Sequence, residues 1–234
     1  MDGKAFKTFE YERIIYLGDP VNIIQIYNDY DIEEMRIIDK SASQMGKINF
    51  NLMERIASEA FFPLTYQGGI KSTDDFARLN NLGFEKVGVN FRPQAERLML
   101  IEGLYEKFSK SSVSLSVDLI EENFECLLYD WKTKLTLGNI LNYHYLKTSD
   151  KFGELVLNFP KRDGLACGLS RNYEVIREFR RGSQLVIACG LANLDEVQNN
   201  ELSSLVDGFG ASRLYSIRDP LETPFIFYRE VNNK

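Results

Sequence analysis

The side-chain types of this chain set the first limit on its chemistry. Its 234 residues include one histidine, His144, in the run Asn-Tyr-His-Tyr. Histidine-based triads and multi-histidine zinc sites are therefore excluded, and we expect His144 to be structural. Acid–base chemistry must then come from carboxylates, lysines or a bound substrate. Because carboxylates do not cluster with histidine or cysteine at ligand spacing, we expect neither a metal nor a cofactor.

A repeated glycine turn is the second feature that could do chemistry. Residues 66–70 with 83–90 resemble residues 188–192 with 206–212. In each copy a glycine, Gly69 or Gly190, follows one apolar run, and Asn90 or Ser212 ends the next. Turns of this kind expose backbone amides that can bind a phosphate, which predicts two phosphate sites. The alternative interpretation is a glycine turn that any strand-to-helix loop could need.

Short apolar runs must position these residues. They occur at residues 35–38, 63–66, 86–89, 113–117, 155–157, 185–188 and 206–210. Near-continuous apolar runs of this length are typical of parallel strands buried on both faces. The stretches between them are amphipathic, so strands and helices alternate and predict one α/β domain over residues 1–234.

Several residues predict where helices begin and which face they bury. Asp19 before Pro20, and Ser72 before two aspartates, are typical N-caps. In the predicted helix over 95–108, residues 95, 98, 101, 105 and 108 share one face and are expected to pack inward.

Composition limits the cellular setting and the partners. The formal net charge of −6 gives no electrostatic case for nucleic acid. The apolar runs are too short to span a membrane, and no secretory pattern begins the chain, so we expect a cytoplasmic protein without membrane or nucleic-acid partners. Cys126, Cys167 and Cys189 are far apart and odd in number, which favours reduced thiols.

Motifs along nearly the whole chain resemble one family. They are residues 17–21, 37–43, 63–70, 85–90, 116–118 and 161–164. These motifs resemble HisF, the cyclase subunit of imidazole glycerol phosphate synthase. The resemblance implies a (β/α)₈ TIM barrel of HisA/HisF type. It would lack the first strand and have a shortened C-terminal end, so that either the natural chain starts earlier or another segment, such as residues 225–228, fills the gap.

The resemblance also implies a catalytic and a substrate-binding site. The family uses two aspartates, of which Asp118 matches the one that ends the fifth strand, and the other has no counterpart here. A simple capping role is the alternative for Asp118. The positions that match substrate and phosphate binding are Lys7, Gly69, Asn90, Asp163, Gly164, Gly190, Ala211 and Ser212.

At the opposite end of the strands, family members gate an ammonia channel with four charged residues. Glu34, Lys86 and Glu154 match three of them, and the arginine belongs to the missing strand. An ordinary salt-bridge cluster is the alternative. Their joint match implies a HisH-like glutaminase partner that supplies ammonia.

The departures from the family pattern point away from an ordinary cyclase. Phe91 replaces a threonine, and Leu191 stands where a second glycine is expected. Arg36 and Lys40 are charged where cyclases are not, while Lys161 and Leu165 replace an aspartate and a threonine. These changes, and a short tail with residues 224–228, resemble HisF-like proteins of surface-polysaccharide clusters.

Three functions remain open from the sequence. The first is a HisF-like subunit that conducts ammonia from a HisH-like glutaminase, with a sugar amidotransferase, to convert the N-acetyl group of a bacterial surface sugar into an acetamidino group. A phosphorylated small molecule is the expected substrate. The second is an authentic imidazole glycerol phosphate synthase cyclase, a lyase of histidine biosynthesis. The third is a degenerate, non-catalytic barrel that scaffolds or activates a glutaminase.

Overall fold

The fold was taken from a computed structural model, which describes residues 3–30, 32–147, 152–180, 183–193, 195–198 and 201–211. These residues fall into two compact units. The first comprises residues 3–6 and 16–87, and the second comprises residues 7–15 and 88–211. The prediction of a single domain stays a prediction.

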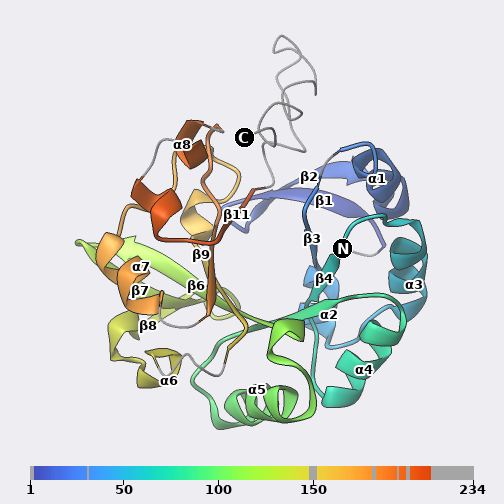
Figure 1. The fold of residues 1–234 in the computed structure, drawn as a ribbon, viewed down its shortest axis with the longest axis horizontal. Coiled ribbons are helices and arrows are strands. Elements are labelled where there is room, and N and C mark those ends of the chain that lie inside the picture. Colours follow the sequence, from blue (N-terminus) through green and yellow to red (C-terminus); the bar gives the residue numbers. More distant parts are fainter. Residues whose placement is uncertain are drawn as a thin grey trace. The chain divides into compact units, whose positions relative to one another are not determined.

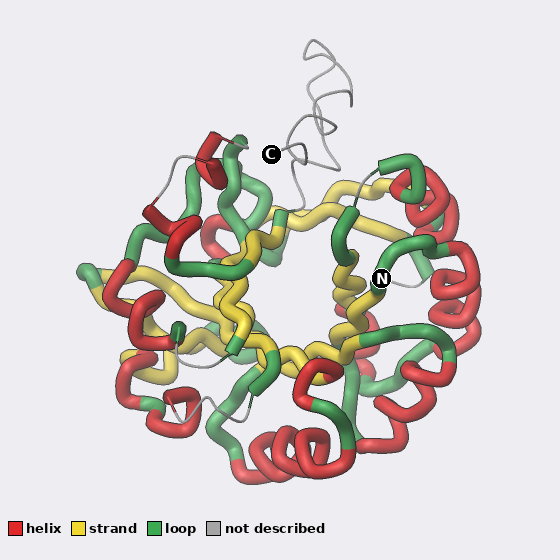
Figure 2. Tube along the Cα trace, viewed as in Figure 1, coloured by secondary structure: helices red, strands yellow, loops and turns green. Residues whose placement is uncertain are grey.

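In the first unit a pair of parallel strands packs with helices. Strand β3 (Met35–Ile38) pairs with β4 (Leu64–Gln67), so that Met35 lies opposite Leu64. Figure 2 shows α1, α3 and α4 in a row on one side of these strands. The helices are α1 (Pro20–Tyr27), α2 (Lys40–Met45), α3 (Phe50–Glu59) and α4 (Thr73–Asn81).

Both predicted N-caps in this unit are confirmed. The carboxylate of Asp19 accepts hydrogen bonds from the first-turn amides of α1, which has Pro20 at its start. Ser72 and Asp75 form a capping box, in which each side chain accepts from the other residue's backbone N–H. Asp39, the residue after β3, is the N-cap of α2, and its side chain accepts a hydrogen bond from a backbone N–H of the first turn.

In the second unit four parallel strands lie side by side. They are β6 (Val113–Glu122), β9 (Glu154–Asn158), β10 (Gln184–Ala188) and β11 (Gly208–Gly210), in the order β6–β9–β10–β11 (Figure 1). The register places Asp118 opposite Asn158 and Asn158 opposite Ala188. Polar residues that end the parallel pairing are therefore neighbours.

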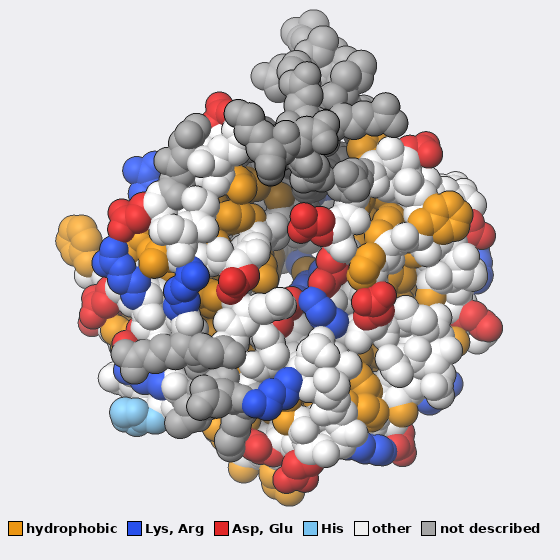
Figure 3. All heavy atoms as spheres, in the orientation of Figure 1, with side chains coloured by type: hydrophobic (Ala, Val, Ile, Leu, Met, Phe, Trp, Pro, Cys, Tyr) orange, Lys and Arg blue, Asp and Glu red, His pale blue; other side chains and the backbone are white. Residues whose placement is uncertain are grey.

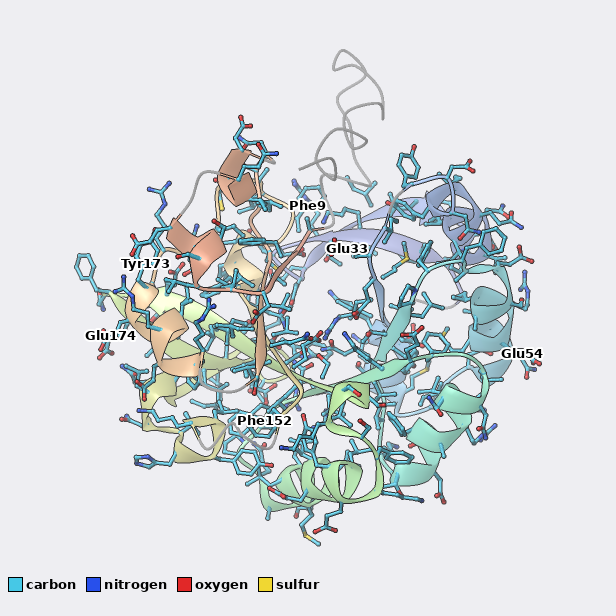
Figure 4. The ribbon with its side chains drawn as sticks, viewed as in Figure 1. Phe9, Glu33, Glu54, Phe152, Tyr173 and Glu174 are labelled. Atoms are coloured by element: carbon cyan, nitrogen blue, oxygen red, sulfur yellow. The ribbon has the colours of Figure 1, made fainter. Side chains whose placement is uncertain are left out.

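The helices of this unit are α5 (Ala95–Lys107), α6 (His144–Lys147), α7 (Tyr173–Phe179) and α8 (Asp195–Gln198). The predicted inward face of α5 is only partly right, because Ile101 and Leu104 are its buried residues and Ala95 is exposed. Phe152, labelled in Figure 4, packs between Tyr105 and Tyr145, with ring centroids 5.4 and 5.5 Å away.

Two hairpins were not predicted. The first joins β1 (Ala5–Phe9) to β2 (Arg13–Gly18). The second extends β6 beyond Asp118 into an antiparallel ribbon with β7 (Glu125–Asp130) and β8 (Leu135–Asn139). Their turns contain non-glycine residues with left-handed φ, including Glu10 at 52° and Phe124 at 68°. Turns of this kind suit hairpin twist, but glycine and asparagine are their usual signals.

The predicted fold class is confirmed. Strand β5 (Lys86–Asn90) runs from the first unit into the second, and the strand order is β11–β10–β9–β6–β5–β4–β3. Each of the seven predicted apolar runs forms one of these strands, so the described residues make up part of a (β/α)₈ arrangement of HisA/HisF type. Residues 225–228 lie outside them. No helix in the described ranges is long and apolar enough to cross a membrane.

Candidate functional site

Asp118 is the centre of the candidate site in the second unit. Its side chain is buried, with 3% of the residue exposed. The amide of Asn90 donates to one carboxylate oxygen at 2.7 Å, and the amide of Asn158 donates to the other at 3.1 Å. The two asparagines end β5 and β9, so strand register places all three side chains together. Parallel pairing stops at Asp118, as predicted, although the strand itself continues to Glu122.

Burial raises the pKa of Asp118 to about 7. The Asn158 amide, the nearby Arg92 guanidinium and the Asn90 amide lower the pKa, while Asp130 raises it. Burial therefore outweighs two hydrogen bonds and a positive charge. A carboxyl group with a pKa near neutrality can both accept and release a proton at physiological pH, which is what general acid–base catalysis needs.

Arg92 and Asp130 form an ion pair near Asp118. The Arg92 Nη2 atom lies 2.9 Å from an oxygen of Asp130, whose residue is 5% exposed. The same Asp130 oxygen accepts the backbone N–H of Lys132 at 3.0 Å. Arg92 lies two residues after the end of β5, and Asp130 ends β7, so the pair joins the loop after β5 to the antiparallel ribbon that extends β6.

The tip of the β1–β2 hairpin, residues 7–15, brings two predicted site residues together. Lys7 is buried, and its Nζ atom lies 3.8 Å from the carboxylate of Asp163. Thr8 donates its hydroxyl hydrogen to the other oxygen of Asp163 at 2.6 Å. The Glu10 backbone N–H also donates to the Asp163 carbonyl oxygen at 2.9 Å. The loop after β9 is thus held by the hairpin tip.

A phenol and a thiol complete this region. Tyr11 Oη and Cys189 Sγ are 4.0 Å apart. Burial raises the pKa of the Cys189 thiol to about 12, and burial and then Cys189 raise the pKa of Tyr11. Asp118 and Asp163 also raise both pKa values through their charges. Both groups are therefore protonated at neutral pH, and all three cysteines of the chain are free, as predicted.

The two glycines predicted for the second phosphate site are in close contact with protein backbone. Gly164 has a φ of 74°, and a Cβ there would lie 2.5 Å from the Thr8 carbonyl oxygen. Gly190 has a φ of 99°, and its Cβ would lie 2.4 Å from the carbonyl oxygen of Gly168. Local packing alone accounts for glycine at both positions. Ala211 follows β11 and is partly buried, and Ser212 lies outside the described residues.

The first predicted phosphate site is divided between the two units. Gly69 belongs to the first unit, where a Cβ would lie 2.7 Å from the carbonyl oxygen of Ala42 in α2. Asn90 belongs to the second unit. Next to Asn90, Phe91 is buried and stacks on Tyr145 with 5.8 Å between ring centroids. The residue that replaces the family's threonine thus belongs to an aromatic cluster.

Two of the predicted gate residues meet in the first unit. Lys86 Nζ lies 2.5 Å from one oxygen of Glu34, and the Thr65 hydroxyl donates to the other oxygen at 2.5 Å. Further along the same strands, Arg36 donates to the Gln67 side-chain oxygen at 3.0 Å. Glu154 begins β9 and is buried in the second unit. His144, the pale blue side chain in Figure 3, is exposed at the start of α6.

Sequence reasoning missed four residues that contact or influence the predicted site. Asn158 follows the predicted strand at 155–157, so its position at a strand end was a usable signal. No local sequence signal marked Arg92 or Asp130, since their pairing depends on the β6–β7 ribbon. Thr8 gave no signal either, because its partner Asp163 is 155 positions away along the chain.

Comparison with known proteins agrees with this architecture. A family model described as "Histidine biosynthesis protein" matches residues 1–215. The HisF subunit of imidazole glycerol phosphate synthase from Campylobacter concisus is 30% identical, over 81% of this chain and 75% of the relative.

Two other relatives cover nearly all of this chain. One is a candidate imidazole glycerol phosphate synthase subunit, hisF3, of Vibrio vulnificus, with 28% identity over 97% of this chain and 89% of the relative. Another is a candidate subunit, hisF2, of Pseudomonas aeruginosa, with 27% identity over 99% and 93%. The match over residues 1–215, together with these relatives, means that this chain belongs to the histidine biosynthesis protein family and is a HisF-like member of it.

Proposed function

We propose that this chain is a HisF-like synthase subunit that receives ammonia from a HisH-like glutaminase for the amidation of a bacterial surface sugar. The sugar's N-acetyl group would become an acetamidino group, in which ammonia-derived nitrogen replaces the carbonyl oxygen. For the oxygen to leave, the sugar amidotransferase partner would first transfer a phosphoryl or nucleotidyl group from a nucleoside triphosphate to it. Attack by ammonia would then expel the oxygen as phosphate or nucleotide. The observation that carries the proposal is the contrast between the retained Asp118, which is buried between two asparagine side chains, and the altered phosphate positions.

The Asp118 centre supports a catalytic role. A buried carboxyl group, two amide donors and a pKa of about 7 form an arrangement suited to proton transfer. Asp118 would take a proton from an attacking ammonia or give one to a departing oxygen. A residue that only capped the following loop would not need burial between two asparagine side chains. This favours a working subunit over an inert scaffold.

The altered phosphate positions support a substrate other than that of the cyclase. Leu191 is buried where the family resemblance expects a glycine that admits a phosphate, and Phe91 is buried in an aromatic cluster. Lys7, expected to reach substrate, is instead paired with Asp163. A substrate with phosphates at both ends would have to displace these contacts.

The Glu34–Lys86 pair supports ammonia entry. It lies at the starts of β3 and β5, at the opposite ends of these strands from Asp39 and Asn90. Thr65 and Gln67 on the intervening β4 are buried and polar. A polar row of this kind can hydrogen-bond a small neutral molecule along the strands.

Two assays separate the proposal from its alternatives. Purified protein with ammonia is expected not to turn over the cyclase substrate, and turnover at a normal rate would establish the authentic cyclase instead. In cells given glutamine with a heavy-nitrogen side-chain amide, mass spectrometry should find the label in an acetamidino sugar. Deletion of the gene should leave the N-acetyl form.

The Asp118→Asn variant tests whether this carboxyl group does the chemistry. We expect label transfer to be lost while the protein stays folded, because asparagine has nearly the same shape but does not titrate. If label transfer survives, Asp118 is not the acid–base residue. If the wild-type protein transfers no label but raises the activity of a co-expressed glutaminase, the chain is a scaffold.

A further inference from the structure

The ion pair between Arg92 and Asp130 has no role in the proposed function so far. Both residues lie in the second unit. Arg92 follows by two residues the Asn90 whose amide contacts Asp118, and Asp130 ends the strand that pairs with β6 from Leu119 onward. Their charges act on Asp118 with opposite sign. Asp130 is 5% exposed, and the Arg92 side chain is 21% exposed. A mostly buried pair is costly to desolvate, and replacing such a pair with apolar residues is often neutral or stabilising. Its presence beside a buried carboxyl group therefore needs a reason other than stability.

The geometry of the pair limits what Arg92 can do. The guanidinium forms its ion pair with Asp130, at 2.9 Å, while Asp118 is bound by the amides of Asn90 and Asn158. Asp130 is held in turn by the backbone N–H of Lys132 at 3.0 Å. The arginine is thus fixed near Asp118 by a partner on a different strand.

A direct ion pair between Arg92 and Asp118 would change the protonation state of Asp118. An opposite charge in contact with a carboxylate lowers its pKa by roughly 1 to 3 units, which would hold Asp118 ionised at neutral pH. Without any positive charge nearby, burial would instead keep the carboxyl group protonated. An arginine held at a distance by a second carboxylate leaves the pKa of Asp118 between these two extremes.

We propose that Arg92 and Asp130 form a positioning pair for Asp118, in which Asp130 holds the guanidinium beside the carboxyl group and prevents a direct ion pair. The pair keeps Asp118 able to gain and lose a proton near neutral pH. This deepens the proposed function, since a proton-transfer role for Asp118 rests on it. Neither residue contacts substrate in this scheme.

Other groups also face Asp118. Asn90 and Asn158 face it from β5 and β9, and neither titrates. Tyr11 of the hairpin tip and Cys189 after β10 also interact with its charge, but burial raises both of their pKa values. Arg92 and Asp130 are therefore the charged groups whose removal should move the Asp118 titration near neutral pH.

The test is the titration of Asp118 itself, followed by carbon-13 NMR of protein labelled at the aspartate carboxyl carbon. The Asp118 signal is identified by its loss in Asp118→Asn. We expect a wild-type midpoint near 7. Arg92→Met should raise the midpoint and Asp130→Asn should lower it, each by about one pH unit, because they remove charges of opposite sign. A merely structural pair would not give opposite shifts.

Controls keep the result interpretable. Arg92→Lys keeps the charge and should shift the midpoint less than Arg92→Met. Arg177→Met, a change on α7, removes an exposed ion pair with Glu201 and should leave the Asp118 midpoint unchanged. Asp130→Asn keeps an oxygen acceptor for the Lys132 N–H, so this variant is expected to fold.

The proposal would be overturned by shifts in the same direction for Arg92→Met and Asp130→Asn, or by no shift in either. A wild-type midpoint in the range of an ordinary exposed aspartate would overturn it as well. No substrate or partner is present in this experiment. Opposite shifts combined with no label transfer in cells would therefore contradict the proposed function alone.

Discussion

Asp118 is a carboxyl group that folding places in an unfavourable environment for charge. Its pKa of about 7 in the folded chain is well above the value of about 3.9 expected for an unfolded aspartate. The unfolded chain therefore ionises first as pH rises. The contribution of this group to stability is most favourable below the unfolded pKa and is progressively lost as pH rises towards the folded pKa.

Replacement of Asp118 by asparagine should remove this pH dependence. Between pH 5 and pH 8 we expect wild-type stability to fall by about 2 to 3 kcal/mol relative to Asp118→Asn, since ionisation of the buried carboxyl group is the only difference in titration. Urea unfolding of both proteins at the two pH values measures it. A constant difference across the range would mean that Asp118 titrates like an ordinary exposed aspartate.

At the scale of elements, the β1–β2 hairpin combines a costly turn with firm contacts. Glu10 and Tyr11 have φ values of 52° and 61°, which cost roughly 1 to 2 kcal/mol each for residues with a Cβ. The ion pair of Lys7 with Asp163 and the hydrogen bond from Thr8 to Asp163 offset this cost in conformational energy. The position of the Asp163 loop and the shape of this turn are therefore linked.

The left-handed turn predicts the sign of the stability change when glycine replaces one of its residues. Glu10→Gly should raise stability by up to about 1 kcal/mol, because glycine adopts left-handed φ without steric cost, although it has more entropy to lose on folding. The variant also loses an exposed ion pair to Lys161 at 3.9 Å, and exposed pairs contribute little. Glu12→Gly is the matched control. Its backbone is not left-handed and it loses the ion pair to Lys134, so we expect a loss of stability. Thermal unfolding of both variants measures the difference.

The glycines next to the hairpin tip and after β10 should behave differently from Gly138, a glycine of β8 with open space around it. Gly164→Ala and Gly190→Ala place a Cβ 2.5 and 2.4 Å from backbone oxygens, so we expect losses of about 2 to 4 kcal/mol. Gly138→Ala has a φ of 101° but nothing within 4 Å, and should cost about 1 kcal/mol from backbone strain alone. Equal losses at all three positions would mean that close approach does not matter.

At the scale of the whole molecule, ammonia transfer requires that glutamine hydrolysis and product formation stay coupled. Lys86→Ala removes the cation bound to Glu34. In the glutaminase complex we expect the hydrolysis of glutamine to continue while product per glutamine falls severalfold, because ammonia is no longer admitted selectively. Lys134→Ala, which breaks an exposed ion pair with Glu12, is the control. An unchanged ratio in Lys86→Ala would show that this pair is not a gate.

The sequence was informative wherever one local pattern determined the structure. Apolar runs predicted all seven parallel strands in the described residues. Burial on both faces accounts for β4 and β9, whereas β3 and β11 are only partly buried. Asp19 and Ser72 predicted helix starts because capping is local. The hairpins were missed because Glu10 and Tyr11 carry no glycine signal, although Asn123 was a usable one. In the site, Asn90 was predicted from the repeated glycine turn and Asp118 from the family resemblance, whereas the pairing of Arg92 with Asp130 depends on long-range register.

The buried carboxyl group between two asparagines also has a thermal consequence. In weakly acidic solution Asp118 is protonated in the folded chain and ionised in the unfolded one, so unfolding releases a proton to the buffer. The heat recorded in a calorimeter then includes the heat of protonating that buffer. Melting curves taken in phosphate and in an amine buffer should give different apparent enthalpies of unfolding. The size of the difference gives the number of protons released when the chain unfolds.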